Sequence, residues 1–368
     1  MIDRLNNLLD QFLGRGSAAI AIPPFDGALK PNQLLDQAEE VAVLDEPEDL
    51  ATDGTSVFIA DGPRVLQYVG STVSEAARVE GPITALAWLP AGGLAVAIDG
   101  RQVRILSGPH RGRTWDAAGG APFHGVNALC GTGDGRLLAT DGSRTQPHQR
   151  WCHDLLELGR SGRCIEIELG GGAREIARGL AYAFGACPAG GDVWVSESWA
   201  HRIRRIGAPA GAAAAGGPVL DRLPGYPSRI VPAKNGGFWL TVFTARTQLV
   251  EFVLREHAFR KRMMKEIDPE HWVAPALRWG RTYLEPMQGA HIKTMGIVKP
   301  WAPPRAYGLV IRLTPEGLLR YSLHSRIDGS NHGVVAAAEC GDSLFVLAKG
   351  PRRLLRVSIA HAERSLQA

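Results

Sequence analysis

Three side chains that could exchange protons with a substrate lie at or just before short apolar runs. Glu48 begins one run, His124 lies three residues before Asn127 in a second, and His332 lies two residues before Val334 in a third. A carboxylate and two histidines can run general acid–base catalysis, because an unperturbed imidazole titrates close to neutral pH. We therefore predict Glu48, His124 and His332 as catalytic residues.

A second group of residues could bind a substrate or polarise one of its oxygens. It comprises Thr84, Asn127, Phe184, Ser228, Arg229 and Trp151. Trp151 belongs to an irregular segment, residues 144–157, whose His148, Trp151 and His153 could reach the mouth of a pocket. A binding pocket needs only a few convergent polar groups among apolar ones, and this group supplies both kinds.

An internal repeat indicates how these residues are brought together. Each copy has a short apolar strand, a glycine-containing turn and a second apolar strand, and the copies are 48–61, 84–99, 127–141, 184–197, 229–242 and 334–348. The glycines suit hairpin turns, which need positive φ angles. A large apolar residue follows the first residue of every copy by ten positions, from Phe58 to Leu344. This constant offset predicts six copies of one element.

Further strand-like segments follow most copies, for example residues 64–69, 102–108, 202–207 and 353–359. Two hairpins per copy give four strands per copy, so the sequence predicts an all-β, six-bladed β-propeller. The first residues of the copies would then meet near the axis, and we call this set the axial column. It consists of Glu48, Thr84, Asn127, Phe184, Arg229 and Val334.

The repeat predicts one propeller domain over residues 41–360. Residues 1–40 form a helical extension, because Ile2, Leu5, Leu8, Leu9 and Phe12 have helical spacing, and residues 361–368 form a tail. An insertion over about 251–300 is expected between blades five and six, as a helix followed by a Pro- and Gly-rich loop. It is interpreted either as a lid over the pocket or as a contact in a homodimer.

Composition excludes several classes of protein. The net charge is only +4, from 41 basic and 37 acidic residues, which argues against nucleic acid as a partner and leaves a small-molecule ligand. No apolar run reaches the length of a transmembrane helix, and the first residues do not resemble a secretory signal. The five scattered cysteines form no CxxC pair, so we expect a reducing, cytoplasmic setting.

Several motifs resemble one superfamily over roughly residues 40–360. EPEDLATDG, GLAYAFGACPAGGDVWVSE, LPGYPSRIVPAKNGGFW and AYGLVIRLTPEG are similar to segments of strictosidine synthase-like and gluconolactonase/regucalcin-type propellers, to which paraoxonases are related. The resemblance implies a six-bladed propeller with an axial pocket. It does not by itself name a reaction, because this scaffold supports several activities.

The resemblance also implies a calcium site on the axis, but this chain keeps only part of the ligand set. Glu48 matches the family's first-blade Glu and Asn127 its third-blade Asn, so these two would remain as ligands if a site persisted. Phe184 stands where the family has a second Asn, and Ser228-Arg229 replaces its Asp-Asn. We therefore expect no cofactor and no metal, with Arg229 neutralising Glu48 in place of calcium.

Strictosidine synthases condense an amine with an aldehyde and use a sixth-blade Glu. That position falls at or near Val335 here, and Glu339 is expected at the end of a strand away from the axis. The preferred interpretation is hydrolysis of a lactone or ester by Glu48 and a histidine. A metal-free condensing or rearranging enzyme, with an apolar pocket made by Phe184 and Val334, and a non-catalytic binding propeller are the two alternatives.

Overall fold

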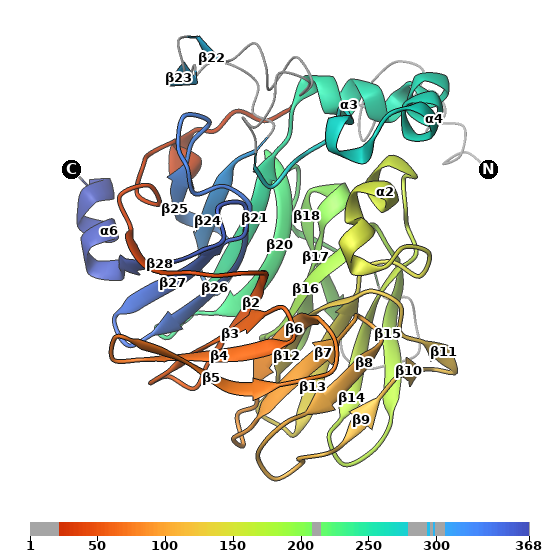
Figure 1. Ribbon diagram of the computed structural model, residues 1–368, viewed down its shortest axis with the longest axis vertical. Coiled ribbons are helices and arrows are strands. Elements are labelled where there is room, and N and C mark those ends of the chain that lie inside the picture. Colours follow the sequence, from red (N-terminus) through yellow and green to blue (C-terminus); the bar gives the residue numbers. More distant parts are fainter. Residues whose placement is uncertain (1–21, 208–214, 279–292, 295–296, 299–305, 368) are drawn as a thin grey trace.

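The computed structural model describes residues 22–207, 215–278, 293–294, 297–298 and 306–367. Within them the chain forms six four-stranded antiparallel sheets arranged radially around one axis (Figure 1). This confirms the all-β, six-bladed propeller with four strands per blade. Each of the six predicted copies supplies the two innermost strands of one blade.

The first three blades follow one another in chain order. Their strands are, for blade one, β2 (Pro47–Thr52), β3 (Val57–Asp61), β4 (Arg64–Val69) and β5 (Thr72–Arg78); for blade two, β6 (Ile83–Trp88), β7 (Leu94–Ile98), β8 (Gln102–Ile105) and β9 (Thr114–Trp115); and for blade three, β12 (Val126–Gly131), β13 (Arg136–Asp141), β14 (Gly162–Glu168) and β15 (Ala173–Leu180). The short pair β10 (Ala117–Ala118) and β11 (Ala121–Pro122) lies between blades two and three in sequence.

The other three blades complete the ring. Their strands are, for blade four, β16 (Ala183–Ala189), β17 (Asp192–Glu197), β18 (Arg202–Gly207) and β19 (Ala215–Leu220); for blade five, β20 (Gly225–Pro232), β21 (Phe238–Ala245), β24 (Gly308–Leu313) and β25 (Leu319–Ser325); and for blade six, β26 (Val334–Cys340), β27 (Ser343–Ala348), β28 (Arg353–Ser358) and β1 (Glu39–Val43). Blade six therefore joins the N-terminal strand β1 to three C-terminal strands.

The helices lie outside the blades. They are α2 (Trp151–Leu156), α3 (Gln248–Arg255), α4 (His257–Glu266) and α6 (Ile359–Gln367), with 3-10 turns η2 (Gly27–Leu29), η3 (His148–Arg150), η4 (Ser198–Ala200) and η5 (Pro269–His271). The α6 helix occupies most of the predicted tail. The predicted helix near the N-terminus falls on residues 1–21, which lie outside the described part of the chain.

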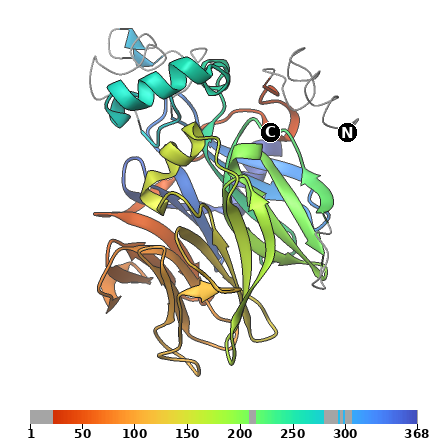
Figure 2. The same cartoon turned by 90° about the vertical axis from the view of Figure 1, so that its right-hand side faces the viewer.

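The insertion lies inside blade five rather than between blades five and six. It joins β21 to β24, and these two strands pair directly from Phe238↔Leu313 to Val242↔Leu309. The misplacement arose because the third and fourth strands of this blade come after the insertion in sequence. The first half is helical as expected: α3 begins where the Thr247 side chain accepts a hydrogen bond from the Val250 N–H. Helices α3 and α4 project beyond the ends of the blades (Figure 2).

A β-bulge recurs in the innermost strand of all six blades. In blade one, Pro47 pairs with Asp61 and Asp49 with Ala60, which leaves Glu48 in the bulge. The corresponding irregularities contain Thr84, Asn127, Phe184, Ser228-Arg229 and Val335. A bulge re-aims the side chain and backbone groups at that point, so the six blades present irregular backbone at the same level.

The bulge corrects the axial column in blade six, where Val335 and not Val334 is the equivalent of Glu48. Val334 pairs with Ala348 and Ala336 pairs with Leu347, so Val335 is the extra residue. The ten-residue offset also holds from Val335 to Phe345, because Phe345 pairs with Ala338 as Phe58 pairs with Ala51. Apolar residues fill both registers, so the offset alone did not distinguish Val334–Leu344 from Val335–Phe345. The corrected column is Glu48, Thr84, Asn127, Phe184, Arg229 and Val335.

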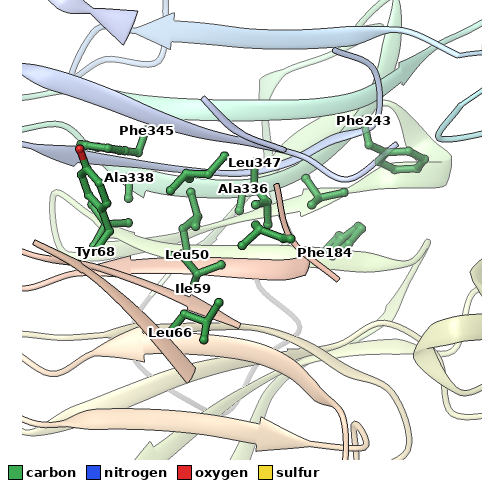
Figure 3. Close-up of a cluster of buried hydrophobic side chains, with 14 of the residues drawn as sticks. Leu50, Ile59, Leu66, Tyr68, Phe184, Phe243, Ala336, Ala338, Phe345 and Leu347 are labelled. Carbon is green, nitrogen blue, oxygen red and sulfur yellow. The ribbon is translucent and has the colours of Figure 1, made fainter. Parts of the chain in front are cut away.

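Apolar side chains fill the spaces between neighbouring blades. One cluster joins Leu50, Ile59 and Leu66 of blade one to Phe345 and Leu347 of blade six (Figure 3). The three inner strands of blade one are largely buried, whereas all but one residue of the outermost strand β5 is exposed. Apolar burial of this kind is the main favourable contribution to folding. Here it packs the first blade of the ring against the last.

His324 is a buried neutral histidine in β25. Its Nε2 lies 2.7 Å from the Ser322 hydroxyl, and its Nδ1 lies 3.0 Å from the Tyr307 hydroxyl. Burial lowers the pKa of His324 to about 3. The unfolded chain therefore binds a proton at this residue below pH 6.5 that the folded protein does not bind, so stability is lost as the pH falls through that range.

We predict that His324 contributes a loss of about 2 kcal/mol in unfolding free energy between pH 7.5 and pH 5. His324→Gln removes this contribution, so its unfolding free energy declines less over the same range. Urea titrations at several pH values measure the difference. His361→Gln, at an exposed histidine, serves as the control and keeps the wild-type slope. Equal slopes for His324→Gln and wild type would contradict the prediction.

Candidate functional site

The guanidinium of Arg229 fills the centre of the propeller. Its Nη1 donates to the carbonyl oxygens of Glu48 at 3.0 Å and Val335 at 3.2 Å. Its Nη2 donates to those of Thr84 at 3.0 Å and Asn127 at 2.6 Å. The four acceptors are bulge residues of blades one, six, two and three, and Arg229 itself comes from blade five. One side chain therefore links the inner strands of four blades to that of its own blade, which makes five.

The charge of Arg229 is matched by acidic and aromatic neighbours. Its Nε lies 3.0 Å from Asp49 Oδ1, and its Nη2 lies 3.6 Å from Glu48 Oε1. The ring of Phe184 lies 5.0 Å from the guanidinium carbon, in a cation–π contact. Arg229 is only 4% exposed, so these contacts replace nearly all of its hydration.

Asp49 anchors the guanidinium to blade one and to blade two. Its carboxylate accepts hydrogen bonds from the backbone N–H groups of Leu50 and Leu86, both at 2.8 Å. Burial raises the pKa of Asp49 to about 7, although Arg229 and the two N–H donors favour the charged form. Both oxygens of the Asp49 carboxylate contact Arg229 or backbone N–H groups, and Asp49 does not line the pocket described below.

Glu48 is a buried acidic group that lines the pocket. Its Oε1 lies 2.8 Å from His148 Nε2, and its Oε2 forms an ion pair with Lys349. Burial opposes ionisation, but Lys349, His148 and Arg229 together outweigh it and hold the pKa of Glu48 well below its usual range. Glu48 is therefore a carboxylate throughout the physiological pH range.

His148 reaches Glu48 from the irregular segment of blade three, where it begins η3. Burial lowers the pKa of His148 despite the neighbouring Glu48, so the ring is neutral at pH 7. A neutral ring next to a carboxylate carries its proton on Nε2, where it donates to Glu48, and leaves Nδ1 to accept from the Tyr182 hydroxyl at 3.5 Å. Phe184 packs edge-on against the imidazole.

A cavity of about 360 Å³ opens above Glu48. Residues from blades one, two, three and six and from the blade-five insertion line it. They are Asp45, Glu46, Pro47, Glu48, Gly62, Pro82, Ile83, Thr84, Gln149, Leu277, Arg278, Lys349, Gly350 and Arg352. The volume suits a small molecule, and the lining combines apolar surface with both signs of charge.

Several predicted binding residues lie at this centre, but their side chains form hydrogen bonds within the protein. The Asn127 amide donates to the Ala183 carbonyl at 2.9 Å and accepts from the Thr140 hydroxyl at 2.7 Å. Thr84 Oγ1 donates to the Val126 carbonyl at 2.6 Å. The Ser228 hydroxyl pairs with Thr241 at 2.8 Å. Only Thr84 of these three lines the cavity.

The structure gives the two predicted catalytic histidines partners other than Glu48. His332 Nε2 donates to the Arg326 carbonyl at 2.7 Å, and its ring is buried. His124 is held through its backbone N–H, 3.3 Å from Asp141 Oδ2. Neither lines the cavity. Trp151 on α2 packs against Trp199 and Phe243 in an aromatic cluster.

His148 and Lys349 are the residues at the centre that sequence reasoning did not select. His148 was considered only as part of segment 144–157, and no repeat position marks it. Lys349 follows β27 directly and is one of only seven lysines in the chain. That scarcity is a weak sequence signal that could have marked Lys349 as a candidate functional residue. Glu339 lies at the strand end as expected, where it accepts from the Trp239 indole at 2.8 Å.

The residues at the axis do not fit a calcium ion. Calcium takes six to eight oxygen ligands, and the carbonyls available here already accept hydrogen bonds from Arg229. A divalent ion about 4 Å from the guanidinium would be repelled by roughly 8 kcal/mol at an effective dielectric constant of 20. That is about the whole binding free energy of a micromolar site. Among the described residues, no three His, Cys, Asp or Glu side chains gather as a ligand set.

Comparisons with known structures place this geometry on a known scaffold. A gluconolactonase from Xanthomonas campestris superposes with a TM-score of 0.56 at 14% identity, covering 92% of this chain and 95% of that one. A calcium-binding regucalcin from Agrobacterium tumefaciens superposes with a TM-score of 0.50 at 11% identity, covering 88% and 92%. The chain has the fold of the gluconolactonase and regucalcin propellers. At these identities the likeness concerns the fold alone.

Sequence comparison finds curated relatives at higher identity than these solved structures. The mouse adipocyte plasma membrane-associated protein is 26% identical over 356 residues, covering 86% of this chain and 77% of that protein. The human counterpart is also 26% identical, over 335 residues, covering 81% and 72%. No family model matches the chain. In the part that the structure describes, no helix is long and apolar enough to cross a membrane.

We predict that Arg229→Met lowers the unfolding free energy by about 3–5 kcal/mol, because it leaves Asp49 without its ion-pair partner and four backbone carbonyls without their donor. Guanidinium chloride titration of the purified protein measures the change. Arg178→Met is the control, since that side chain is 87% exposed and changes stability by less than about 0.5 kcal/mol. A loss below about 1 kcal/mol for Arg229→Met would mean that the central contacts do not hold the blades together.

Proposed function

We propose that the protein is a metal-independent hydrolase that opens a lactone or ester in the cavity above Glu48. The observation that carries the proposal is the pairing of an ionised carboxylate with an ammonium group at the floor of a small-molecule cavity. Glu48 and Lys349 both line that cavity, so a substrate carbonyl and a water molecule can meet them together.

In the proposed reaction, Glu48 accepts a proton from water as the water oxygen attacks the carbonyl carbon. Lys349 donates a hydrogen bond to the carbonyl oxygen and stabilises the negative charge that develops on it. The bond from carbon to the ester oxygen then breaks, and Glu48 returns the proton to the leaving alkoxide. The product is a hydroxy acid, or an acid and an alcohol.

The low pKa of Glu48 sets a requirement on this mechanism. A carboxylate held so strongly in its charged form is a weak base, so it cannot activate water efficiently by itself. Electrophilic assistance from Lys349 must supply much of the barrier reduction. Removing one such donor typically costs 10²–10³-fold in rate.

The fold supports a lactonase-type propeller, since solved gluconolactonases share it. The absence of calcium from the mechanism is part of the proposal and rests on Arg229. In this chain a guanidinium contacts the carbonyls around the axis and lies 3.6 Å from Glu48. Arg229 thereby supplies a fixed positive charge beside Glu48.

We predict that Glu48→Gln reduces hydrolysis at least about 100-fold, because the amide cannot accept the proton of the attacking water. A panel of lactones and aryl esters, assayed with a pH indicator, identifies a substrate and then measures the variants. Glu46→Gln is the matched control: it removes a carboxylate that lines the same cavity but does not contact Lys349, and we expect activity within about threefold of wild type.

Two outcomes would contradict the hydrolase proposal. Equal losses in both variants would indicate a general effect of charge and not a role for Glu48. No turnover of any substrate in the panel, combined with tight binding that Glu48→Gln leaves unchanged, would favour a non-catalytic binding propeller.

We further predict that a chelator leaves wild-type activity and melting temperature unchanged. The double variant Ser228→Asp/Arg229→Asn restores the residues that the related calcium propellers carry and removes the competing cation. Its melting temperature should rise on addition of calcium, because an ion that binds only the folded state stabilises it. A wild-type melting temperature that falls when chelator is added would contradict the proposed independence from calcium.

A further inference from the structure

Cys130 and Cys187 bring two thiols together across the boundary between blades three and four. Cys130 lies on β12, three residues after Asn127, and Cys187 lies on β16, three residues after Phe184. The two residues thus occupy matching positions on innermost strands that are neighbours in the ring. Their side chains are hydrogen-bonded to each other, and both cysteines are free thiols.

The two thiols differ in access to solvent. Cys187 is fully buried in a core cluster between blades four and five, and the half-buried Cys130 packs against that same cluster. Each sulfur also lies near the carbonyl of its following residue, at 3.7 Å for Cys130 and 3.5 Å for Cys187. A reagent can therefore reach Cys130 first, with Cys187 already placed beside it.

We propose that Cys130 and Cys187 form a reversible disulfide between blades three and four when the protein meets a hydroperoxide. Sensor cysteines of this kind combine a reachable thiol with a neighbouring thiol that resolves the first product. This modification site is separate from the cavity above Glu48, so it does not depend on the proposed hydrolase activity.

The chemistry balances with one hydroperoxide per disulfide. The Cys130 sulfur attacks one peroxide oxygen, the O–O bond breaks, and a sulfenic acid forms with release of water or an alcohol. The Cys187 sulfur then attacks the Cys130 sulfur, the S–O bond breaks, and water leaves with the proton from Cys187. Two thiols are oxidised and the peroxide is reduced.

The resolving step sets the rate. The hydrogen bond with Cys130 and burial raise the pKa of the Cys187 thiol well above its ordinary value, so little thiolate is present. Proximity offsets this, because the attack takes place within one folded molecule. Cys164 on β14 is the competing partner, but it is fully buried and burial raises its pKa to about 12.

The test treats the folded, reduced protein with limited hydrogen peroxide and counts thiols after denaturation. Wild type should fall from five thiols to three, with a mass loss of about 2 Da. Peptide mapping should find Cys130 linked to Cys187, and dithiothreitol should reverse the change. Cys340→Ser, in blade six, is the control and should still lose two thiols.

Cys187→Ser should form no disulfide, and its Cys130 sulfenic acid should be trapped by dimedone. The oxidised wild type should melt at a higher temperature than the reduced protein, because the bond closes a loop between residues that are 57 positions apart in the sequence. The peptide map of wild type decides the question even if Cys187→Ser does not fold. Retention of five thiols, or a Cys130–Cys164 link, would overturn the proposal.

Discussion

A single buried guanidinium sets the arrangement on which the rest of the structure depends. A propeller needs its inner strands to meet at an axis where irregular backbone leaves polar groups unpaired, and buried unpaired carbonyls are costly. Arg229 donates hydrogen bonds to four of these carbonyls. The carboxyl groups of Glu48 and Asp49 lie beside its positive charge and balance it. The position of Glu48 at the cavity floor is a consequence, because its own backbone carbonyl is one of the four.

The repeated and the irregular parts of the chain contribute different things to the candidate site. The repeat supplies Glu48 and the scaffold of bulges that surrounds Arg229. The chemistry of Glu48, however, is set by His148 from an insertion in blade three and by Lys349 from a loop after β27. Leu277 and Arg278 of the blade-five insertion complete the lining of the cavity. A common scaffold thereby acquires an individual site through segments outside its repeat.

This division explains how much the sequence could predict. Periodic apolar residues and turn glycines report local geometry, so six blades and most of the axial column were predictable. Phe184 and Arg229 were placed correctly at the axis, while Val334 was one residue off because Val334–Leu344 and Val335–Phe345 both fit the ten-residue offset. His148 and Lys349 contact Glu48 across 100 and 301 residues of sequence, and no local pattern encodes such contacts. His124 and His332 have the right residue type and lie near inner strands, but neither lines the cavity.

The closure of blade six constrains how the chain folds during synthesis. Strand β1 leaves the ribosome early, yet Arg353 of its partner β28 comes 310 positions after Val43 in the sequence. At roughly 5–20 residues per second, β1 waits about 15–60 s with an unsatisfied edge. Its first residues, Glu39 and Glu40, are charged and exposed in the folded protein, which discourages pairing with other nascent chains during that interval. The acidic start of β1 therefore protects the edge of this strand from wrong pairing before the propeller has formed.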